Sequence, residues 1–139
     1  MTAVPTTAAL LGVKGSARDA LHKSSLAGLP VSAFDKFVSE SGLEATEVAE
    51  VIALPARTLA RRRTAGKLSP DESDKLVRFT ELYRKTLDMF AGSTKAAVGW
   101  LRETRPALGG SRPIELARTS DGTKQVETLI FQLEYGIIV

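Results

Sequence analysis

Residues 44–63, EATEVAEVIALPARTLARRR, contain two short amphipathic segments that are joined by a tight turn. Val48 and Ile52 are separated by one helical repeat and therefore lie on one face of the first segment. Pro55, whose φ angle is already set, is predicted to start the second helix. Leu59 is then placed to pack back onto Val48 and Ile52. Two short helices, a tight turn and a buried seam form the helix-turn-helix pattern, so this stretch predicts the fold around it.

The turn departs from the usual pattern at one position. Ala53 stands where such turns usually carry glycine, because the residue there adopts a positive φ. Keeping that geometry with alanine costs about 1 kcal/mol. Leu54, the next residue, is predicted to point inward. The sequence leaves open whether this altered turn still presents a helix that reads bases.

Positive charge is concentrated on the second of these helices. The first helix carries Glu44, Glu47 and Glu50, whereas the second carries four arginines and is followed by a lysine. DNA presents about one negative charge per 1.7 Å of helix axis, so a recognition helix is expected to be cationic, although a solvated basic face is the alternative. Early residues of a recognition helix reach base edges, and flanking cations hold phosphates. We assign base reading to Arg57, Thr58 and Arg61, and phosphate contacts to Arg62, Arg63 and Lys67.

Start and stop signals predict helices on both sides of this region. Residues 1–30 are rich in Ala, Ser, Gly and Thr and are expected to be loosely structured, with one short helix near residues 17–26. Ser32 is predicted to cap a helix that Gly42 ends, and residues 69–72, SPDE, are a strong start for a helix that stops at Gly92. Further helices are expected over residues 95–104, 113–119 and 123–136, with residues 120–122 as a turn. No segment alternates like a strand, so the predicted fold is all-α, with a helix-turn-helix part over residues 31–68 and a second helical part over residues 69–139.

The composition excludes several classes of protein. The 139 residues are 43% hydrophobic and 25% charged, which is typical of a soluble globular chain. There is no apolar run of about 18 residues and no basic residue ahead of the N-terminal apolar patch, so we expect neither a membrane span nor a secretory signal and place the chain in the cytoplasm. The chain has no cysteine, one histidine (His22) and no nucleophile–base pattern. We therefore expect no enzymatic activity, no metal and no cofactor.

Two apolar surfaces are wider than a single packing seam requires. The helix after Ser69 repeats apolar residues at a 3-4 spacing with others beside them, which fits either a central core helix or a homodimer contact. Near the C-terminus, Phe131 and Tyr135 and the last three residues add apolar surface with little chain left to cover it. Such an end is either tucked into its own core or offered to a partner, and the residues alone leave both open.

From about residue 31 to residue 139 the chain resembles the Xre/MbcA/ParS antitoxin family, whose partners are RES-domain toxins of type II toxin–antitoxin systems. The resemblance rests on residues 58–83, TLARRRTAGKLSPDESDKLVRFTELY, and 95–139, KAAVGWLRETRPALGGSRPIELARTSDGTKQVETLIFQLEYGIIV. It implies a helix-turn-helix followed by a helical toxin-binding part. It also implies an antitoxin that covers the active site of an NAD-consuming or ADP-ribosylating toxin and represses its own operon.

The resemblance also suggests roles for individual residues in the C-terminal part. Trp100 is expected in the core, and Gly109 and Gly110 in a turn. The residues expected to touch the toxin are Arg112, Arg118, Tyr135, Ile137, Ile138 and Val139. The implied partners are a RES-domain toxin, operator DNA and a second copy of the chain. The alternative is a stand-alone helix-turn-helix repressor whose C-terminal part only dimerises.

Overall fold

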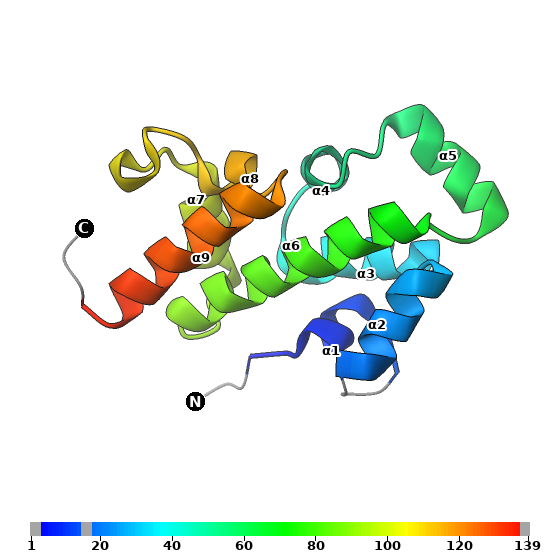
Figure 1. The fold of residues 1–139 in the computed structure, drawn as a ribbon, viewed down its shortest axis with the longest axis horizontal. Coiled ribbons are helices and arrows are strands. Elements are labelled where there is room, and N and C mark those ends of the chain that lie inside the picture. Colours follow the sequence, from blue (N-terminus) through cyan, green and yellow to red (C-terminus); the bar gives the residue numbers. More distant parts are fainter. Residues whose placement is uncertain (1–3, 15–17, 137–139) are drawn as a thin grey trace.

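The computed structural model describes residues 4–14 and 18–136, and every regular element in these ranges is helical (Figure 1). The helices are α1 (Thr7–Leu11), α2 (Arg18–Ala27), α3 (Val31–Ser41), α4 (Ala45–Val51), α5 (Ala56–Ala65), α6 (Pro70–Met89), α7 (Thr94–Arg102), the short 3₁₀ helix η1 (Pro106–Leu108), α8 (Pro113–Leu116) and α9 (Ser120–Glu134). Within the described ranges the only extended pairing is an isolated bridge between Pro30 and Lys67. The prediction of an all-α fold is therefore confirmed. No helix in these ranges is long and apolar enough to cross a membrane.

Helix α6 is the centre of the fold. It contacts α1, α2 and α3 on the N-terminal side and α7 and α9 on the C-terminal side (Figure 1). The rings of Phe79 and Tyr83 pack edge-on against Phe37 of α3, with ring centroids 5.7 and 5.4 Å apart. The Tyr83 hydroxyl donates a hydrogen bond to the Ser41 carbonyl at 3.0 Å, and burial raises its pKa to about 12. Much of the apolar stripe of this helix, including Leu76, Phe79 and Tyr83, is thus buried within the chain.

The start of α6 follows the prediction from its sequence. The Ser69 hydroxyl accepts a hydrogen bond from the Glu72 amide at 3.1 Å, and the Glu72 carboxylate accepts one from the Ser69 amide at 2.8 Å. Pro70 occupies the first helical position, where its missing N–H costs nothing. This reciprocal capping box fixes where the central helix begins.

The N-terminal segment is more ordered than the expected loose end. Helix α2 lies close to the predicted short helix, but α1 was not predicted; Leu10 and Leu11 in it are 3% and 2% exposed, and it packs against α3 and α6. Gly28 then approaches the chain ahead of α6 so closely that a Cβ there would lie 2.5 Å from the Leu68 carbonyl oxygen. Within residues 4–14 and 18–30 the structure thus has two helices that pack against the rest of the chain, where the composition indicated one.

Three predicted helix starts are wrong by a few residues. Helix α3 begins at Val31 with Pro30 as its N-cap, so Ser32 lies inside the helix. Helix α5 begins at Ala56, and Pro55 is its N-cap rather than its first residue. Thr119 caps α9 by accepting a hydrogen bond from the Gly122 amide at 2.9 Å, so residues 120–122 form the first turn of that helix instead of a separate turn.

Candidate nucleic-acid interface and partner surface

The turn between α4 and α5 keeps the geometry of a helix-turn-helix despite its alanine. Ala53 has a φ of 55°, which is the left-handed conformation expected at this position. Leu54 is 2% exposed, as predicted, and its amide donates a hydrogen bond to the Ala49 carbonyl at 2.8 Å. The positive φ of Ala53 costs about 1 kcal/mol of conformational strain, and the turn keeps its geometry in spite of this cost.

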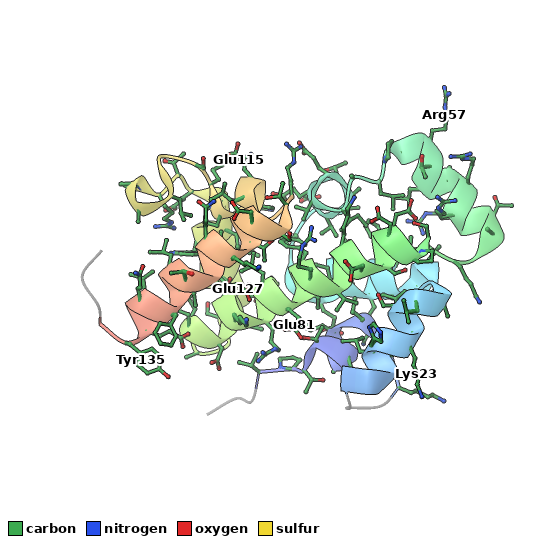
Figure 2. The ribbon with its side chains drawn as sticks, in the orientation of Figure 1. Lys23, Arg57, Glu81, Glu115, Glu127 and Tyr135 are labelled. Atoms are coloured by element: carbon green, nitrogen blue, oxygen red, sulfur yellow. The ribbon has the colours of Figure 1, made fainter. Side chains whose placement is uncertain are left out.

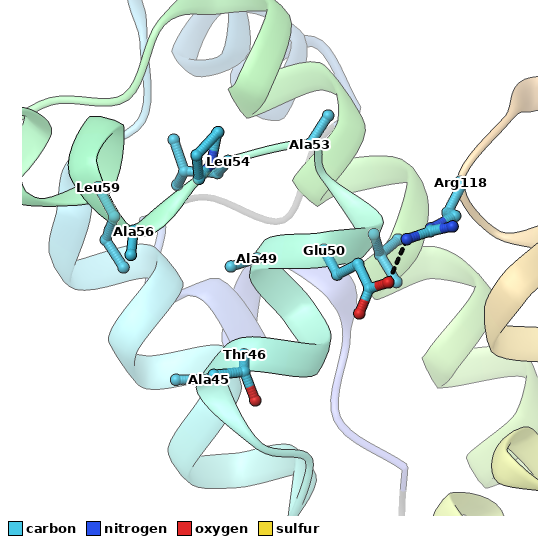
Figure 3. A pocket seen from close by; sticks show the side chains of 11 residues that line it. Ala45, Thr46, Ala49, Glu50, Ala53, Leu54, Ala56, Leu59 and Arg118 are labelled. Carbon is cyan, nitrogen blue, oxygen red and sulfur yellow. Dashed lines mark hydrogen bonds and ion pairs between the residues drawn. The ribbon is translucent and has the colours of Figure 1, made fainter.

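Helix α5 projects from the body of the protein, and none of its residues is buried (Figure 1). Val48 and Ile52 of the preceding segment are fully buried, whereas Leu59 packs against the core and remains partly exposed. An open groove of about 610 Å³ separates α4 from α5 and is lined mainly by small and apolar side chains, among them Ala49, Ala56 and Leu59 (Figure 3). The predicted seam between the two helices is therefore more open than expected.

The residues assigned to base reading lie on the free side of α5. Arg57 and Arg61 are exposed, stand one helical repeat apart and make no ion pair with any described residue. Figure 2 shows the Arg57 side chain directed away from the body of the protein. Thr58 is half-buried, and Lys67, just after the helix, is exposed. Arg57, Arg61 and Lys67 thus leave positive charge exposed on and just after α5.

Arg62 and Arg63 instead form ion pairs with carboxylates of the same chain. The Arg62 guanidinium donates two hydrogen bonds to the Glu72 carboxylate, at 2.9 and 3.1 Å. Arg63 donates two to Asp35 of α3, at 2.8 and 2.9 Å. Burial alone would raise the pKa of Glu72, but the hydrogen bonds from Arg62 and from the Ser69 backbone outweigh it and lower that pKa. Two bidentate bridges thus fasten the C-terminal half of α5 to α6 and α3.

The residues expected to touch a partner do not form one patch. The Arg118 guanidinium pairs with Glu50 of α4, and the Arg112 Nε donates a hydrogen bond to Glu115 at 2.8 Å. Tyr135 lies just after α9 at the other end of that helix, as the positions of Glu115 and Tyr135 in Figure 2 show. Ile137, Ile138 and Val139 lie outside the described residues.

The end of α9 carries an exposed aromatic pair. Tyr135 is 71% exposed and its ring lies 4.5 Å from that of Phe131, which is 54% exposed. Leu133, which the helical spacing places on another face of α9, is 44% exposed. Large apolar side chains that gather on a surface indicate a contact with another molecule. The sequence showed this excess of apolar residues but not that they stay uncovered.

Structural roles in the C-terminal part agree with the predictions. Trp100 is buried at 7% exposure, and the Arg105 guanidinium lies 5.0 Å from the centre of its ring. Gly109 and Gly110 have φ angles of 67° and 82°, which suit glycine in a tight turn. Within residues 4–14 and 18–136 no group of histidine and carboxylate side chains is placed to hold a metal ion.

Comparison with known proteins assigns both parts of the chain. Residues 20–81 match the Antitoxin Xre-like helix-turn-helix domain, and residues 86–136 match the Antitoxin Xre/MbcA/ParS C-terminal toxin-binding domain. The two matches meet inside α6, so this helix belongs to the cores of both parts and no separate linker divides them.

Relatives of similar length extend this assignment over most of the chain. The chain is 30% identical over 128 residues to an Antitoxin Xre of Yersinia enterocolitica, covering 91% of this chain and 86% of the relative. It is 30% identical over 112 residues to an Antitoxin Xre of Photorhabdus laumondii, covering 80% and 76%. It is 25% identical over 118 residues to the Prs ADP-ribosylating antitoxin of Sphingobium sp., covering 78% and 74%. The chain therefore belongs to the Xre/MbcA/ParS antitoxin family and is the antitoxin, not an enzyme, of a toxin–antitoxin system, with a helix-turn-helix domain and a toxin-binding domain.

Proposed function

We propose that this antitoxin neutralises a RES-domain toxin, an NAD-consuming or ADP-ribosylating enzyme, by covering its active site, and that it represses its own operon. The proposed neutralisation of the toxin is supported by the match of residues 86–136 to a toxin-binding domain and by the family motifs in residues 95–139. The name of the Sphingobium relative, which refers to ADP-ribosylation, supports the same class of toxin. Both activities require the toxin and the operon to be in the same compartment, so we place the chain in the cytoplasm.

The proposed DNA contact is the free face of α5. Arg57 and Arg61 are exposed and unpaired within the described residues, so each guanidinium is available to bind a guanine edge in the major groove. Thr58 lies between them, and Lys67 is placed to hold a phosphate. Binding as a homodimer would bring two such helices to two half-sites of an operator.

Arg62 and Arg63 have a different role in this proposal from the phosphate contacts first assigned to them. To reach phosphates they would have to leave Glu72 and Asp35 and expose those carboxylates to the DNA polyanion. We therefore propose that both arginines support α5 from behind, while Arg57, Arg61 and Lys67 carry the contact with DNA.

The proposed toxin contact is the exposed end of α9. Phe131 and Tyr135 form a stacked pair that is open to solvent, and aromatic side chains of this kind often dominate protein interfaces. The last three residues, Ile137, Ile138 and Val139, follow directly in the sequence and extend this apolar stretch. Arg112 and Arg118 flank α8, near the start of α9 and away from Tyr135. The proposed toxin contact therefore does not depend on them.

Growth rescue tests the proposal. The RES-type toxin from the neighbouring reading frame is expressed in cells together with the wild-type chain or with the Phe131→Ala/Tyr135→Ala variant. Leu26→Ala is the control, because Leu26 is 62% exposed on the distant helix α2. We expect wild type and control to restore growth and the double variant to fail while remaining folded. Full rescue by the double variant would exclude this surface. No rescue by wild type would instead favour a stand-alone repressor.

A further inference from the structure

A cluster of charges joins the helix-turn-helix to the toxin-binding domain. It lies beside a polar cleft of about 130 Å³ that is lined by residues of α4 and by residues in and around α8. Arg102, at the end of α7, donates hydrogen bonds to both carboxylate oxygens of Glu47 on α4, at 3.0 and 2.6 Å. One turn further along α4, Glu50 pairs with Arg118, which follows α8 (Figure 3). Two carboxylates on the first helix of the helix-turn-helix are thus held by two arginines of the other domain.

Glu47 also closes the first turn of α4. Its carboxylate accepts a hydrogen bond from the Glu44 amide at 2.9 Å, which completes a capping box at the helix N-terminus. The hydrogen bonds from Arg102 lower the pKa of Glu47, and the smaller contribution of the Glu44 amide acts in the same direction. The Glu47 side chain is 23% exposed and the Arg102 side chain 40% exposed, so the pair is only partly shielded from solvent. Arg102 therefore holds the start of α4 as well as its polar face.

The position of α4 fixes the N-terminal end of α5. The two helices are connected by the tight turn at Ala53, and α5 has no fully buried residue, although Leu59 packs against the core. At its other end α5 is held by the ion pairs of Arg62 and Arg63. A displacement of α4 would therefore be transmitted through the turn and would move Arg57 and Arg61.

We propose that Arg102, supported by Arg118, is a positioning residue for DNA binding, although it lies in the toxin-binding domain. This inference rests on the proposed reading of DNA by α5. It assigns Arg102 no contact with the duplex, because its guanidinium is occupied by Glu47. The antitoxin then needs its C-terminal domain for full operator affinity even when no toxin is present.

Fluorescence anisotropy of the full chain tests this inference. The probes are a duplex from the region upstream of its own gene and a scrambled duplex of the same composition, each titrated at several salt concentrations. The variants are Arg102→Gln, Arg102→Lys, Glu47→Gln and the double Glu47→Gln/Arg102→Gln. Lys124→Gln is the matched control, because Lys124 is exposed on α9, forms no ion pair with a described residue and loses the same charge.

We expect Arg102→Gln to weaken specific binding about two- to fivefold, as the loss of a partly shielded ion pair implies. Arg102→Lys should retain most of the affinity, and Glu47→Gln should lose as much as Arg102→Gln. The double variant should lose no more than either single one. The salt slope should not change, because no phosphate contact is removed. Circular dichroism verifies that each variant is folded. If Arg102→Gln does not fold, Arg102→Lys and Glu47→Gln still decide the test.

Three results would overturn the inference. Equal affinities for Arg102→Gln and Lys124→Gln would show that only net charge matters. A salt slope smaller by about 1 would show that Arg102 touches a phosphate itself. Tighter binding by Glu47→Gln would show that the carboxylate repels DNA rather than positioning α4. If the wild type bound both duplexes equally, the proposed reading of DNA would fail first, and this inference with it.

Discussion

Arg61 and Arg62 are adjacent in the sequence, and we expect opposite consequences when each is replaced by alanine. Arg61 is exposed and makes no ion pair with a described residue. Arg62 donates two hydrogen bonds to Glu72, whose side chain is 10% exposed. Glu72 also completes the capping box of the central helix α6. Arg62→Ala therefore removes two hydrogen bonds from a nearly buried carboxylate, whereas Arg61→Ala removes none.

The size of the effect follows from the geometry of the pair. Hydrogen bonds to charged groups stabilise folded proteins by about 1.5–3 kcal/mol, and the 30% exposure of the Arg62 side chain reduces this through solvent screening. Arg62→Ala leaves the Glu72 carboxylate, which is 10% exposed, without both of these hydrogen bonds, so we expect the variant to lower the free energy of unfolding and to lower Tm by several degrees. Arg61→Ala should stay within about 0.5 kcal/mol of the wild type.

Two assays separate the residues. Thermal unfolding followed by circular dichroism measures the difference in stability. Binding to the upstream duplex at several salt concentrations measures the difference in DNA contact. Arg61→Ala should reduce discrimination against the scrambled duplex by about 1–3 kcal/mol, whereas Arg62→Ala should leave the salt slope unchanged. Equal Tm values for the two variants, or a salt slope that falls by about 1 in Arg62→Ala, would refute the division of roles along α5.

Two further predictions concern stability. Gly122→Ala should cost about 1–3 kcal/mol in chemical denaturation, because a Cβ at this position would lie 2.1 Å from the Leu116 carbonyl oxygen; Gly99→Ala, which meets nothing within 4 Å, is the control and should be neutral or slightly stabilising. An equal loss in both variants would contradict the close approach of α9 to α8. The pKa values of Glu47 and Glu72 are lowered in the folded state, so their ion pairs stabilise the protein above the unfolded glutamate pKa of about 4.3, and this stabilisation is lost as the pH falls further through the folded values. When Tm is measured from pH 7 to pH 3, we therefore expect it to decrease once the pH is lower than about 4.3, and to decrease less steeply in Glu72→Gln than in the wild type. Identical slopes of Tm against pH in the two proteins would exclude a contribution of Glu72 to this loss of stability.

The sequence was most informative where local chemistry decides structure. The capping box at Ser69 and the positive φ at Ala53 each follow from a residue and its near neighbours, whereas the buried Trp100 was expected from the family resemblance. Consecutive residues of a helix are about 100° apart, so Arg61, Arg62 and Arg63 cannot all face one groove. Which of them form ion pairs was not predictable, because Glu72 and Asp35 lie 10 and 28 positions away in the sequence.

The remaining differences come from tertiary contacts without a local signal. Arg102 and Glu47 are separated by 55 residues, and neither stands out from the other charged residues in the sequence. Helix α1 is short and lies in a stretch of low information, so only its burial against α3 and α6 reveals it. The expected toxin contacts Arg112 and Arg118 were grouped with Tyr135 by family resemblance, but α9 separates them in space.

The central claim is that DNA and toxin are bound by surfaces at different ends of the molecule, α5 and the end of α9. A gel-shift titration tests it directly, in which the purified RES-type toxin is added to the antitoxin already bound to the upstream duplex. We expect a slower band that contains all three components. This band should be missing with Phe131→Ala/Tyr135→Ala, while the binary band remains. Release of free duplex on addition of toxin to the wild-type complex would contradict two separate surfaces.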